Sequence, residues 1–455
     1  MASPAIAVVE ARRGGPTKTP PLMYLRTGSA IVLCLGVLLV AGRPGGAVLA
    51  PRAHPASREE VLHQFRGGRD GSQPSGNLIL GANGNLYGMT EFGGPRGDGT
   101  VFELALGVRG ASERIIYRFQ GKTDGAQPQA GLLAGQNGVL FGTTSSGGYR
   151  HCIDYGCGTV FELIPSGTSY SERVIHRFGK SAQDGVGPED ALVADSTGSL
   201  YGTTRFGGGG GFIGVVFELT PSGSSFHESI IHHFQPGMSD GQYPEAGVII
   251  DSAGALYGTT TLGGSGSNCG EGCGIVYKLT PSRKGYRESV IYNFQNSPDG
   301  AVPSAGLLED ASGALYGTTG FGGELSSNCP SGCGTIFKLT PSGNGYSESV
   351  LYSFKGGSDG SAPQAGLTVG TNGVLYGTTE DGGTGGVGTI YSLTPSPSGY
   401  AELVVHSFHP GDDGANPIAG LLAGSNGALY GMTPNGGRFP CGSSGGCGVA
   451  FALMP

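Results

Sequence analysis

The stretch Leu375-Tyr-Gly-Thr-Thr379 is one of seven near-copies of a short motif in this chain. The other copies begin 54 to 60 residues apart, at Leu86, Leu140, Leu200, Leu256, Leu315 and Leu429. Self-similarity at a nearly fixed period indicates that one supersecondary unit has been repeated along the chain. The content of a single unit should therefore decide the fold.

Each unit contains four short apolar runs separated by turn residues. In one unit these runs occupy residues 290–294, 305–308, 315–319 and 334–341. The runs have the length of single strands, and the first alternates Val290, Tyr292 and Phe294 with Ile291 and Asn293. Four strands and four turns per repeat are the content of one propeller blade.

The two ends of the repeat region predict that the ring closes on itself. The region begins with a first-type run at residues 60–65 and ends with a fourth-type run at residues 448–455. Pairing these two runs would complete the last sheet and remove exposed strand edges. We therefore expect an all-β, seven-bladed β-propeller of four-stranded antiparallel blades, closed by an N-terminal strand. The second-type runs should be innermost and the first-type runs outermost.

Glycine makes up 91 of the 455 residues, and two repeated glycines have a predicted role. Gly84 and its equivalents precede the third run, where a tight hairpin needs a positive φ. Gly88 and its equivalents lie inside that run, and we expect them to allow a neighbouring blade or backbone to approach closely.

The N-terminal 50 residues predict export from the cell. A basic start is followed by an apolar run at residues 28–42 and by small residues up to Ala50. This order is typical of a secretory signal peptide, and the run is shorter than the roughly 20 residues of a membrane span. The predicted division is a signal peptide at 1–50, a linker at 51–59 and the propeller at 60–455. The alternative is an uncleaved anchor.

Composition and location narrow the expected partners. The net charge is −8 and the repeat region has no basic cluster, which argues against nucleic-acid binding. We expect a secreted or cell-envelope monomer with no membrane insertion after signal cleavage. Its partner would be an unknown extracellular ligand, protein or glycan. No cofactor and no metal are predicted.

The composite repeat also resembles a known family. Its elements are Asp-Gly-x-x-Pro, Gly-x-Leu-Tyr-Gly-Thr-Thr, Gly-Gly and Gly-Thr-Val-Phe-x-Leu-Thr-Pro. This pattern resembles the Gloeo/Verruco tandem repeat of exported bacterial proteins, over about residues 60–455. The resemblance implies a secreted or surface-attached, propeller-like protein whose activity is generally unassigned. It transfers no catalytic residues.

One aspartate per unit precedes a glycine in the loop from the outermost to the innermost strand. A ring of such carboxylates could bind a hard cation such as Ca²⁺. The other interpretation is an Asx-type turn, in which each carboxylate accepts amides of its own loop. We expect the second. The residues are Asp70, Asp124, Asp184, Asp240, Asp299, Asp359 and Asp413.

Cysteines form four close pairs in the loops between third and fourth strands. In an exported chain an even number indicates disulfides. Zinc would require two pairs to meet, which only the second and third could do. The pairs are Cys152/Cys157, Cys269/Cys273, Cys329/Cys333 and Cys441/Cys447.

Four histidines share one repeat position with tyrosines, which indicates an amphipathic filler and no metal ligand. The histidines are His63, His176, His232 and His406, and the tyrosines are Tyr117, Tyr292 and Tyr352.

The loops from third to fourth strands vary most in length, and they should share one end of the ring with the Asp-Gly loops. Binding usually occurs on such loops. The candidate binding residues are Arg150, His151, Asp154 and Tyr155 in one loop, and Glu380 and Asp381 in another. The alternative is that they are ordinary solvated residues.

The leading functional hypothesis is an exported, non-catalytic binding or interaction scaffold, because no lone nucleophile, acid/base pair or phosphate loop stands out. One alternative is an extracellular enzyme that acts on polysaccharide or a small metabolite at the channel mouth. The other is a structural cell-surface spacer.

Overall fold

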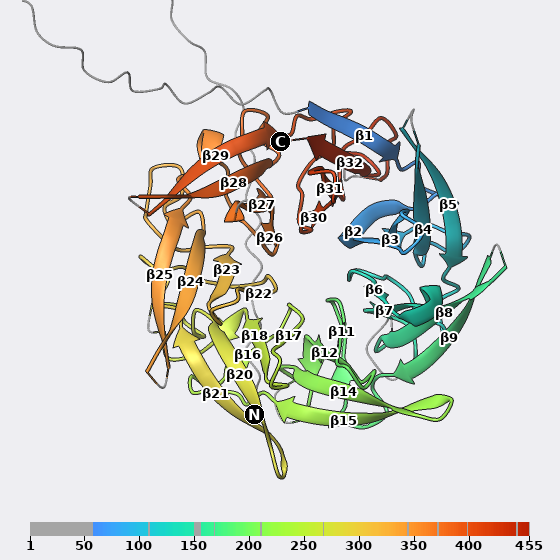
Figure 1. The fold of residues 1–455 in the computed structure, drawn as a ribbon, viewed down its shortest axis with the longest axis horizontal. Helices are drawn as coiled ribbons and strands as arrows, with labels where there is room; N and C mark the ends of the chain where they lie inside the picture. The colour runs from blue at the N-terminus through green and yellow to red at the C-terminus, as the bar shows by residue number, and fades with distance from the viewer. Residues whose placement is uncertain are drawn as a thin grey trace, which may run out of the picture. The chain divides into compact units, whose positions relative to one another are not determined.

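Seven four-stranded antiparallel sheets stand around a central axis (Figure 1). The computed structural model describes residues 58–107, 110–149, 156–167, 169–209, 212–266, 268–343, 345–370, 373–397, 399–442 and 445–454. The predicted signal peptide and most of the predicted linker lie outside these residues. The predicted all-β, seven-bladed propeller is confirmed.

Each blade runs from an innermost to an outermost strand. Blade I is β2 (Ser72–Leu80), β3 (Leu86–Phe92), β4 (Thr100–Gly107) and β5 (Gly110–Arg118). Blade II is β6 (Leu133–Ala134), β7 (Leu140–Thr144), β8 (Thr159–Ser166) and β9 (Ser169–Arg177). Blade III is β11 (Val193–Ala194), β12 (Leu200–Thr204), β14 (Val215–Ser222) and β15 (Ser225–His233). Blade IV is β17 (Ile249–Ile250), β18 (Leu256–Thr260), β20 (Ile275–Ser282) and β21 (Gly285–Asn293).

The remaining blades follow the same order. Blade V is β22 (Leu308–Glu309), β23 (Leu315–Thr319), β24 (Thr335–Ser342) and β25 (Gly345–Ser353). Blade VI is β26 (Thr368–Val369), β27 (Leu375–Thr379), β28 (Thr389–Ser396) and β29 (Gly399–Ser407). Blade VII is β30 (Leu422–Ala423), β31 (Leu429–Thr433), β32 (Val449–Met454) and, from the other end of the chain, β1 (Arg58–Gln64).

The ring is closed by β1, as the sequence predicts. Strand β1 pairs antiparallel with β32, from Arg58 opposite Met454 to Gln64 opposite Val449. In Figure 1 the blue first strand lies beside the red last strand in one sheet. Both segments begin and end within about two residues of their predicted bounds.

The core lies between blades. At every interface a phenylalanine that follows the outermost strand packs on an aromatic ring of the next blade, with ring centroids 5.0 to 5.3 Å apart in a T-shaped arrangement. Phe65 and Phe102 make this contact at the closing interface, and both are fully buried. Such buried aromatic pairs add to the burial of apolar area.

Both repeated glycines are explained by local geometry. The hairpin glycines before the third strand have φ between 76° and 86°, as predicted. The prediction for Gly88 and its equivalents is wrong about the neighbour. A Cβ at Gly88 would lie 2.6 Å from the ring of Phe102, its cross-strand partner in the same blade. The glycine therefore makes room for the aromatic core of its own sheet.

Most of the innermost strands are shorter than the sequence suggests. The run at 305–308 was expected to form a strand, but β22 contains only Leu308 and Glu309. The carbonyl of Ala305 instead accepts a hydrogen bond of 3.1 Å from Thr259 Oγ1 of the preceding blade. The same contact joins Thr203 to Ala246 and Thr318 to Ala365. These segments therefore connect blades near the axis.

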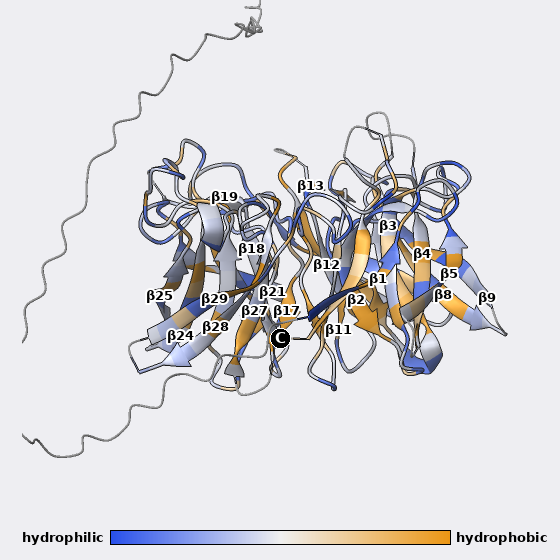
Figure 2. Cartoon of the chain, turned by 90° about the horizontal axis from the view of Figure 1, so that it is seen from above, coloured by the Kyte–Doolittle hydropathy of each residue, from blue (hydrophilic) through white to orange (hydrophobic). Residues whose placement is uncertain are grey.

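The Asp-Gly loops and the loops between third and fourth strands lie at one end of the ring, here called the loop face. In blade III the two loops form a small sheet of β10 (Gly185–Val186) and β13 (Phe206–Gly207). In blade IV they form β16 (Gly241–Gln242) and β19 (Leu262–Gly263). Figure 2 shows β13 and β19 at the same end of the propeller. No helix among the described residues has the length and hydrophobicity needed to cross a bilayer.

Candidate binding site at the channel mouth

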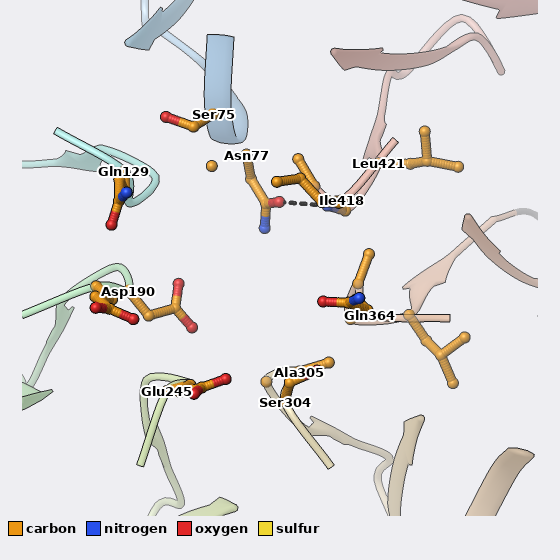
Figure 3. A pocket seen from close by; sticks show the side chains of 18 of the residues that line it. Ser75, Asn77, Gln129, Asp190, Glu245, Ser304, Ala305, Gln364, Ile418 and Leu421 are labelled. Carbon is orange, nitrogen blue, oxygen red and sulfur yellow. Dashed lines mark hydrogen bonds between the residues drawn. The ribbon is translucent and has the colours of Figure 1, made fainter. Parts of the chain in front are cut away.

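A cavity of about 450 Å³ opens at the centre of the ring (Figure 3). Every blade contributes to it the residue that follows the proline of its Asp-Gly loop. In contrast to the constant proline, this residue is serine, glutamine, glutamate or isoleucine, depending on the blade. In chain order these mouth residues are Ser75, Gln129, Glu189, Glu245, Ser304, Gln364 and Ile418.

An unusual backbone conformation holds each mouth residue in place. The residue before the proline has a positive φ in every blade, including Tyr243 at 57° and the β-branched Val302 at 58°. This conformation costs about 1–2 kcal/mol for a residue with a side chain. In return, the Val302 amide donates to the carbonyl of Cys273 in the preceding blade at 2.9 Å. The bond fixes the start of the next innermost segment against its neighbour.

The cavity wall is acidic on one side only. Glu91, Glu189, Asp190 and Glu245 line it from blades I, III and IV. Figure 3 shows Asp190 and Glu245 across the opening from Ile418 and Leu421. Ile418 is an apolar residue with 41% of its surface exposed. The described lining therefore combines a carboxylate wall with an apolar wall.

Arg205 partly neutralises this acidic wall. Its guanidinium lies 3.4 Å from Glu189 Oε2 and 2.9 Å from Glu245 Oε1, so that it connects blades III and IV. Burial raises the pKa of Glu189 to about 7, although Arg205 opposes this effect. Burial also raises the pKa of Glu245. Glu189 can therefore change its charge near neutral pH.

Asp190 is held by the backbone of two blades. It accepts hydrogen bonds of 2.6 Å from the amides of Ala191 and Gly247. On the opposite side, Asn77 Oδ1 accepts from the amide of Gly420 at 2.6 Å and joins blades I and VII. These contacts make the mouth a rigid, preformed site.

Glu380 and Asp381, predicted as binding residues, lie at the edge of this mouth and outside its described lining. Gln364, a mouth residue, donates a hydrogen bond to Glu380. Asp381 Oδ1 accepts from Asn416 Nδ2 at 3.4 Å. Burial, and then the charge of Asp381, raises the pKa of Glu380. A similar pair lies across the ring, where Gln129 donates to Glu91 at 2.9 Å.

The loop containing Arg150, His151, Asp154 and Tyr155 lies outside the described residues. Cys152 lies there too, so the predicted pair with Cys157 cannot be placed. The neighbouring Tyr149 is described and 37% of its surface is exposed.

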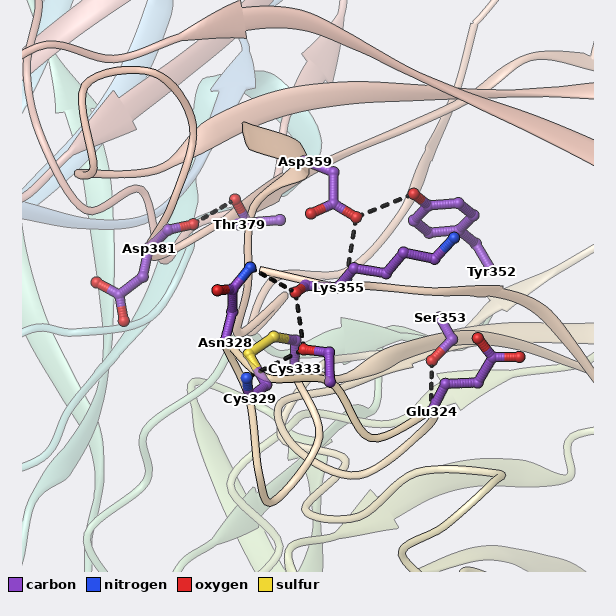
Figure 4. Close-up of a disulfide and its surroundings, with 11 residues drawn as sticks. Glu324, Asn328, Cys329, Cys333, Tyr352, Ser353, Lys355, Asp359, Thr379 and Asp381 are labelled. Atoms are coloured by element: carbon purple, nitrogen blue, oxygen red, sulfur yellow. Dashed lines mark hydrogen bonds between the residues drawn. A yellow bond between two sulfur atoms is a disulfide. The ribbon is translucent and has the colours of Figure 1, made fainter. Parts of the chain in front are cut away.

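The seven Asp-Gly aspartates bond their own loops and not the channel. Each accepts the amide of a residue four or five positions earlier, such as Arg66 for Asp70 at 2.7 Å and Lys355 for Asp359 at 3.0 Å. Figure 4 shows Asp359 between the Lys355 backbone and the Tyr352 hydroxyl, which donates to it at 3.0 Å. The carboxylates thus accept amides of their own loops, but from residues that precede the aspartate, whereas an Asx turn uses the amide two residues after it.

Each aspartate also faces a glutamate from the outermost strand of the next blade. Burial, and then the charge of the aspartate, raises the pKa of most of these interblade glutamates to about 7, and of Glu228 to about 8. Burial raises the pKa of Glu288 as well. These glutamates therefore keep a proton at pH values at which a free glutamate has lost it. The interblade glutamates are Glu59, Glu113, Glu172, Glu228, Glu288, Glu348 and Glu402.

Histidine completes this contact at four interfaces. His63 lies 3.4 Å from Asp70, and His176 lies 3.3 Å from Glu228. In two described clusters, His63/Asp70/Glu113 and His176/Asp184/Glu228, the possible ligand atoms lie within 4.8 Å of one another, which is close enough to hold a metal ion. No pattern within one repeat indicates this contact, because the glutamate comes from another repeat. Tyr117, Tyr292 and Tyr352 make the equivalent contact as hydrogen bonds to aspartate, so the shared role is a polar connection between blades.

Three of the predicted disulfides are present among the described residues: Cys269–Cys273, Cys329–Cys333 and Cys441–Cys447. Beside the second of them, which Figure 4 shows, Ser326 Oγ donates to the carbonyl of Lys355 at 2.9 Å. The amide of Ala362, in the next blade, donates to the carbonyl of Cys333. The disulfides therefore stabilise loops that connect neighbouring blades.

Sequence reasoning missed the mouth residues. The available signal was variation: within the nearly constant Asp-Gly-x-x-Pro segment, the next position changes from serine to glutamine, glutamate and isoleucine.

Comparisons with known proteins support the repeat and the fold. A model of the Gloeobacter/Verrucomicrobia repeat matches residues 51–271, 150–329 and 324–455. Among curated proteins, none is detectably similar in sequence.

Two solved structures show how far the likeness extends. A fungal alcohol oxidase in complex with copper is 11% identical, with a TM-score of 0.52 over 88% of this chain and 77% of that one. The extracellular domain of a protein assigned as a one-component system of B. thetaiotaomicron is 10% identical, with a TM-score of 0.50 over 87% of this chain and 40% of that one. Identities this low show the fold alone.

Proposed function

The chain belongs to the Gloeobacter/Verrucomicrobia repeat family, and we propose that it is an exported, non-catalytic propeller that binds a small cationic solute at its channel mouth. The observation that supports this proposal most directly is where the repeats differ. The residues of the Asp-Gly loop that build the blade stay constant, whereas the mouth residues vary. Variation on a rigid scaffold is the usual arrangement of a binding site.

The chemistry of the mouth favours a cation with an apolar portion. Four carboxyl groups line the described cavity, and Arg205 is the cation that pairs with two of them. The facing Ile418 is exposed and offers apolar contact. A volume of about 450 Å³ lies within the usual range of small-molecule sites, roughly 300–1,000 Å³.

Export is supported by the cysteines. Disulfides form and persist in oxidising compartments, and the described pairs are closed. An extracytoplasmic location would expose the loop face to environmental solutes.

A titration of putrescine against the purified propeller tests the proposal, with uncharged 1,4-butanediol as the control ligand. Removing a carboxylate by Glu245→Gln should weaken diamine binding about three- to tenfold, and Arg205→Gln should strengthen it by a similar factor. Glu271→Gln makes the same charge change in an exposed loop of blade IV and should have no effect. Equal binding of diamine and diol, or a shift of the same sign in both mouth variants, would contradict the proposal.

The enzyme alternative has one specific observation in its favour. Glu189, with a pKa of about 7 beside Arg205, could act as a general acid or base. Turnover of chromogenic glycosides that is abolished by Glu189→Gln would establish the enzyme alternative in place of a non-catalytic scaffold.

A further inference from the structure

A second cavity lies at a blade interface that lacks an aromatic contact found at five others. At five interfaces an aromatic residue near the start of the outermost strand packs on the aromatic residue of the Leu-Tyr-Gly motif in the preceding blade. The rings of Phe141 and Phe226 have centroids 6.4 Å apart. In the other four pairs the two phenol groups interact through their hydroxyls. These pairs are Tyr87 with Tyr170, Tyr201 with Tyr286, Tyr257 with Tyr346, and Tyr316 with Tyr400.

Blade I lacks this aromatic side chain. The equivalent position in β5 is Ala111, which packs in the cluster that contains Tyr430 of blade VII. Ala111 pairs with Leu106 across the β4–β5 hairpin, just as Phe226 pairs with Pro221 in blade III. The register is therefore unchanged, and only the ring is missing.

A cavity of about 530 Å³ opens at this place. Its apolar lining includes Leu62, Leu106, Ala428, Tyr430 and Met454. Leu106 and Met454 have 37% and 49% of their surfaces exposed, which is high for apolar residues at a blade interface.

Polar groups stand at the same cavity. Arg58 and Glu60 of β1 belong to the lining, as does Asn426, whose Nδ2 donates to the Tyr430 hydroxyl at 3.3 Å. At four other interfaces the Leu-Tyr-Gly tyrosine interacts with a second phenol. The cavity thus offers an apolar slot with a hydroxyl and an amide beside it.

We propose that the cavity between blades VII and I binds small phenolic molecules, with the phenol ring in the place that Tyr170 and its equivalents occupy at other interfaces. Four other interfaces specify the ring, its neighbour on the Leu-Tyr-Gly motif and its hydroxyl contact. This site is separate from the channel mouth and does not depend on the function proposed there.

Ligand-observed NMR with p-cresol tests the site, and cyclohexylmethanol serves as the non-aromatic control. We expect p-cresol to bind with a Kd of about 1 mM or lower, which fragment-sized ligands reach in a formed pocket. Ala111→Tyr should fill the cavity with the protein's own phenol ring. It should therefore weaken p-cresol binding at least about tenfold and raise the melting temperature. Ser112→Tyr adds the same side chain at the adjacent exposed position and should leave binding unchanged.

A second blocking variant covers the case in which Ala111→Tyr does not fold. Leu106→Trp places a larger side chain at the exposed rim and should also weaken p-cresol binding. The proposal is overturned if p-cresol fails to bind the wild-type protein at about 10 mM, far above the expected range. It is also overturned if cyclohexylmethanol binds equally well, or if a folded blocking variant binds p-cresol as the wild type does.

Discussion

Replacing Phe65 with alanine tests whether β1 seals the ring in solution. Phe65 follows β1 and packs on Phe102 of blade I, with ring centroids 5.1 Å apart. Phe294 makes the equivalent contact with Phe337 between blades IV and V, also at 5.1 Å. Both phenylalanines are fully buried. Phe294→Ala is therefore a matched control that lies far from the chain ends.

The size of the effect follows from the burial. Deleting a fully buried phenylalanine side chain costs about 3–5 kcal/mol. An unfolding entropy of roughly 2.1 cal/mol/K per residue gives about 0.8 kcal/mol/K for some 400 residues, so the melting temperature should fall by about 4–6 °C. If the ring is closed, both variants should show this loss.

Thermal unfolding followed by circular dichroism measures both variants under the same conditions. The reasoning is refuted if Phe294→Ala melts several degrees below the wild type while Phe65→Ala melts with it. That result would mean that β1 and the interface it forms are already open before the rest of the propeller unfolds.

Two further predictions concern charge and redox state. Because the pKa of most interblade glutamates is raised from 4.5 to about 7, the folded protein holds protons that the unfolded chain has lost between these values. Stability should therefore fall as pH rises through this window, and Glu228→Gln should reduce the slope; a melting temperature that rises from about pH 5 to pH 8 would contradict the raised pKa values of these glutamates. Intact mass of exported protein should increase by about two hydrogens per disulfide on reduction, for at least the three described pairs. An unchanged mass would mean that these thiols are free.

The architecture could be predicted because the same pattern of strands and turns occurs seven times in the sequence. Leu375 to Thr379 and its copies give the third strand, and the run that ends at Phe65 identifies the closing strand. Local patterns of this kind determine strand type and order, since each depends only on residues close in sequence. The extent of the innermost strands was not predictable in this way, because the carbonyl of Ala305 bonds to Thr259 of another blade.

The sites were harder to predict because they form between repeats. Asp184 and Glu228 meet only after blades II and III pack, and no pattern within one unit shows that contact. The mouth residues Glu189 and Glu245 are brought together by the ring and by Arg205. The cavity beside Ala111 is marked by a missing side chain, which has meaning only once its neighbours in other blades are known.

The pairing of Arg58 with Met454 has a practical consequence for engineering. The two ends of the described chain are paired in one β-ladder, so a short linker could join them. New chain ends could then be placed in a hairpin of any other blade. Such circular permutants would keep all seven sheets, and only the position of the chain ends around the ring would change. Comparing them would show whether the ring has a preferred weak point or distributes strain evenly around its circumference.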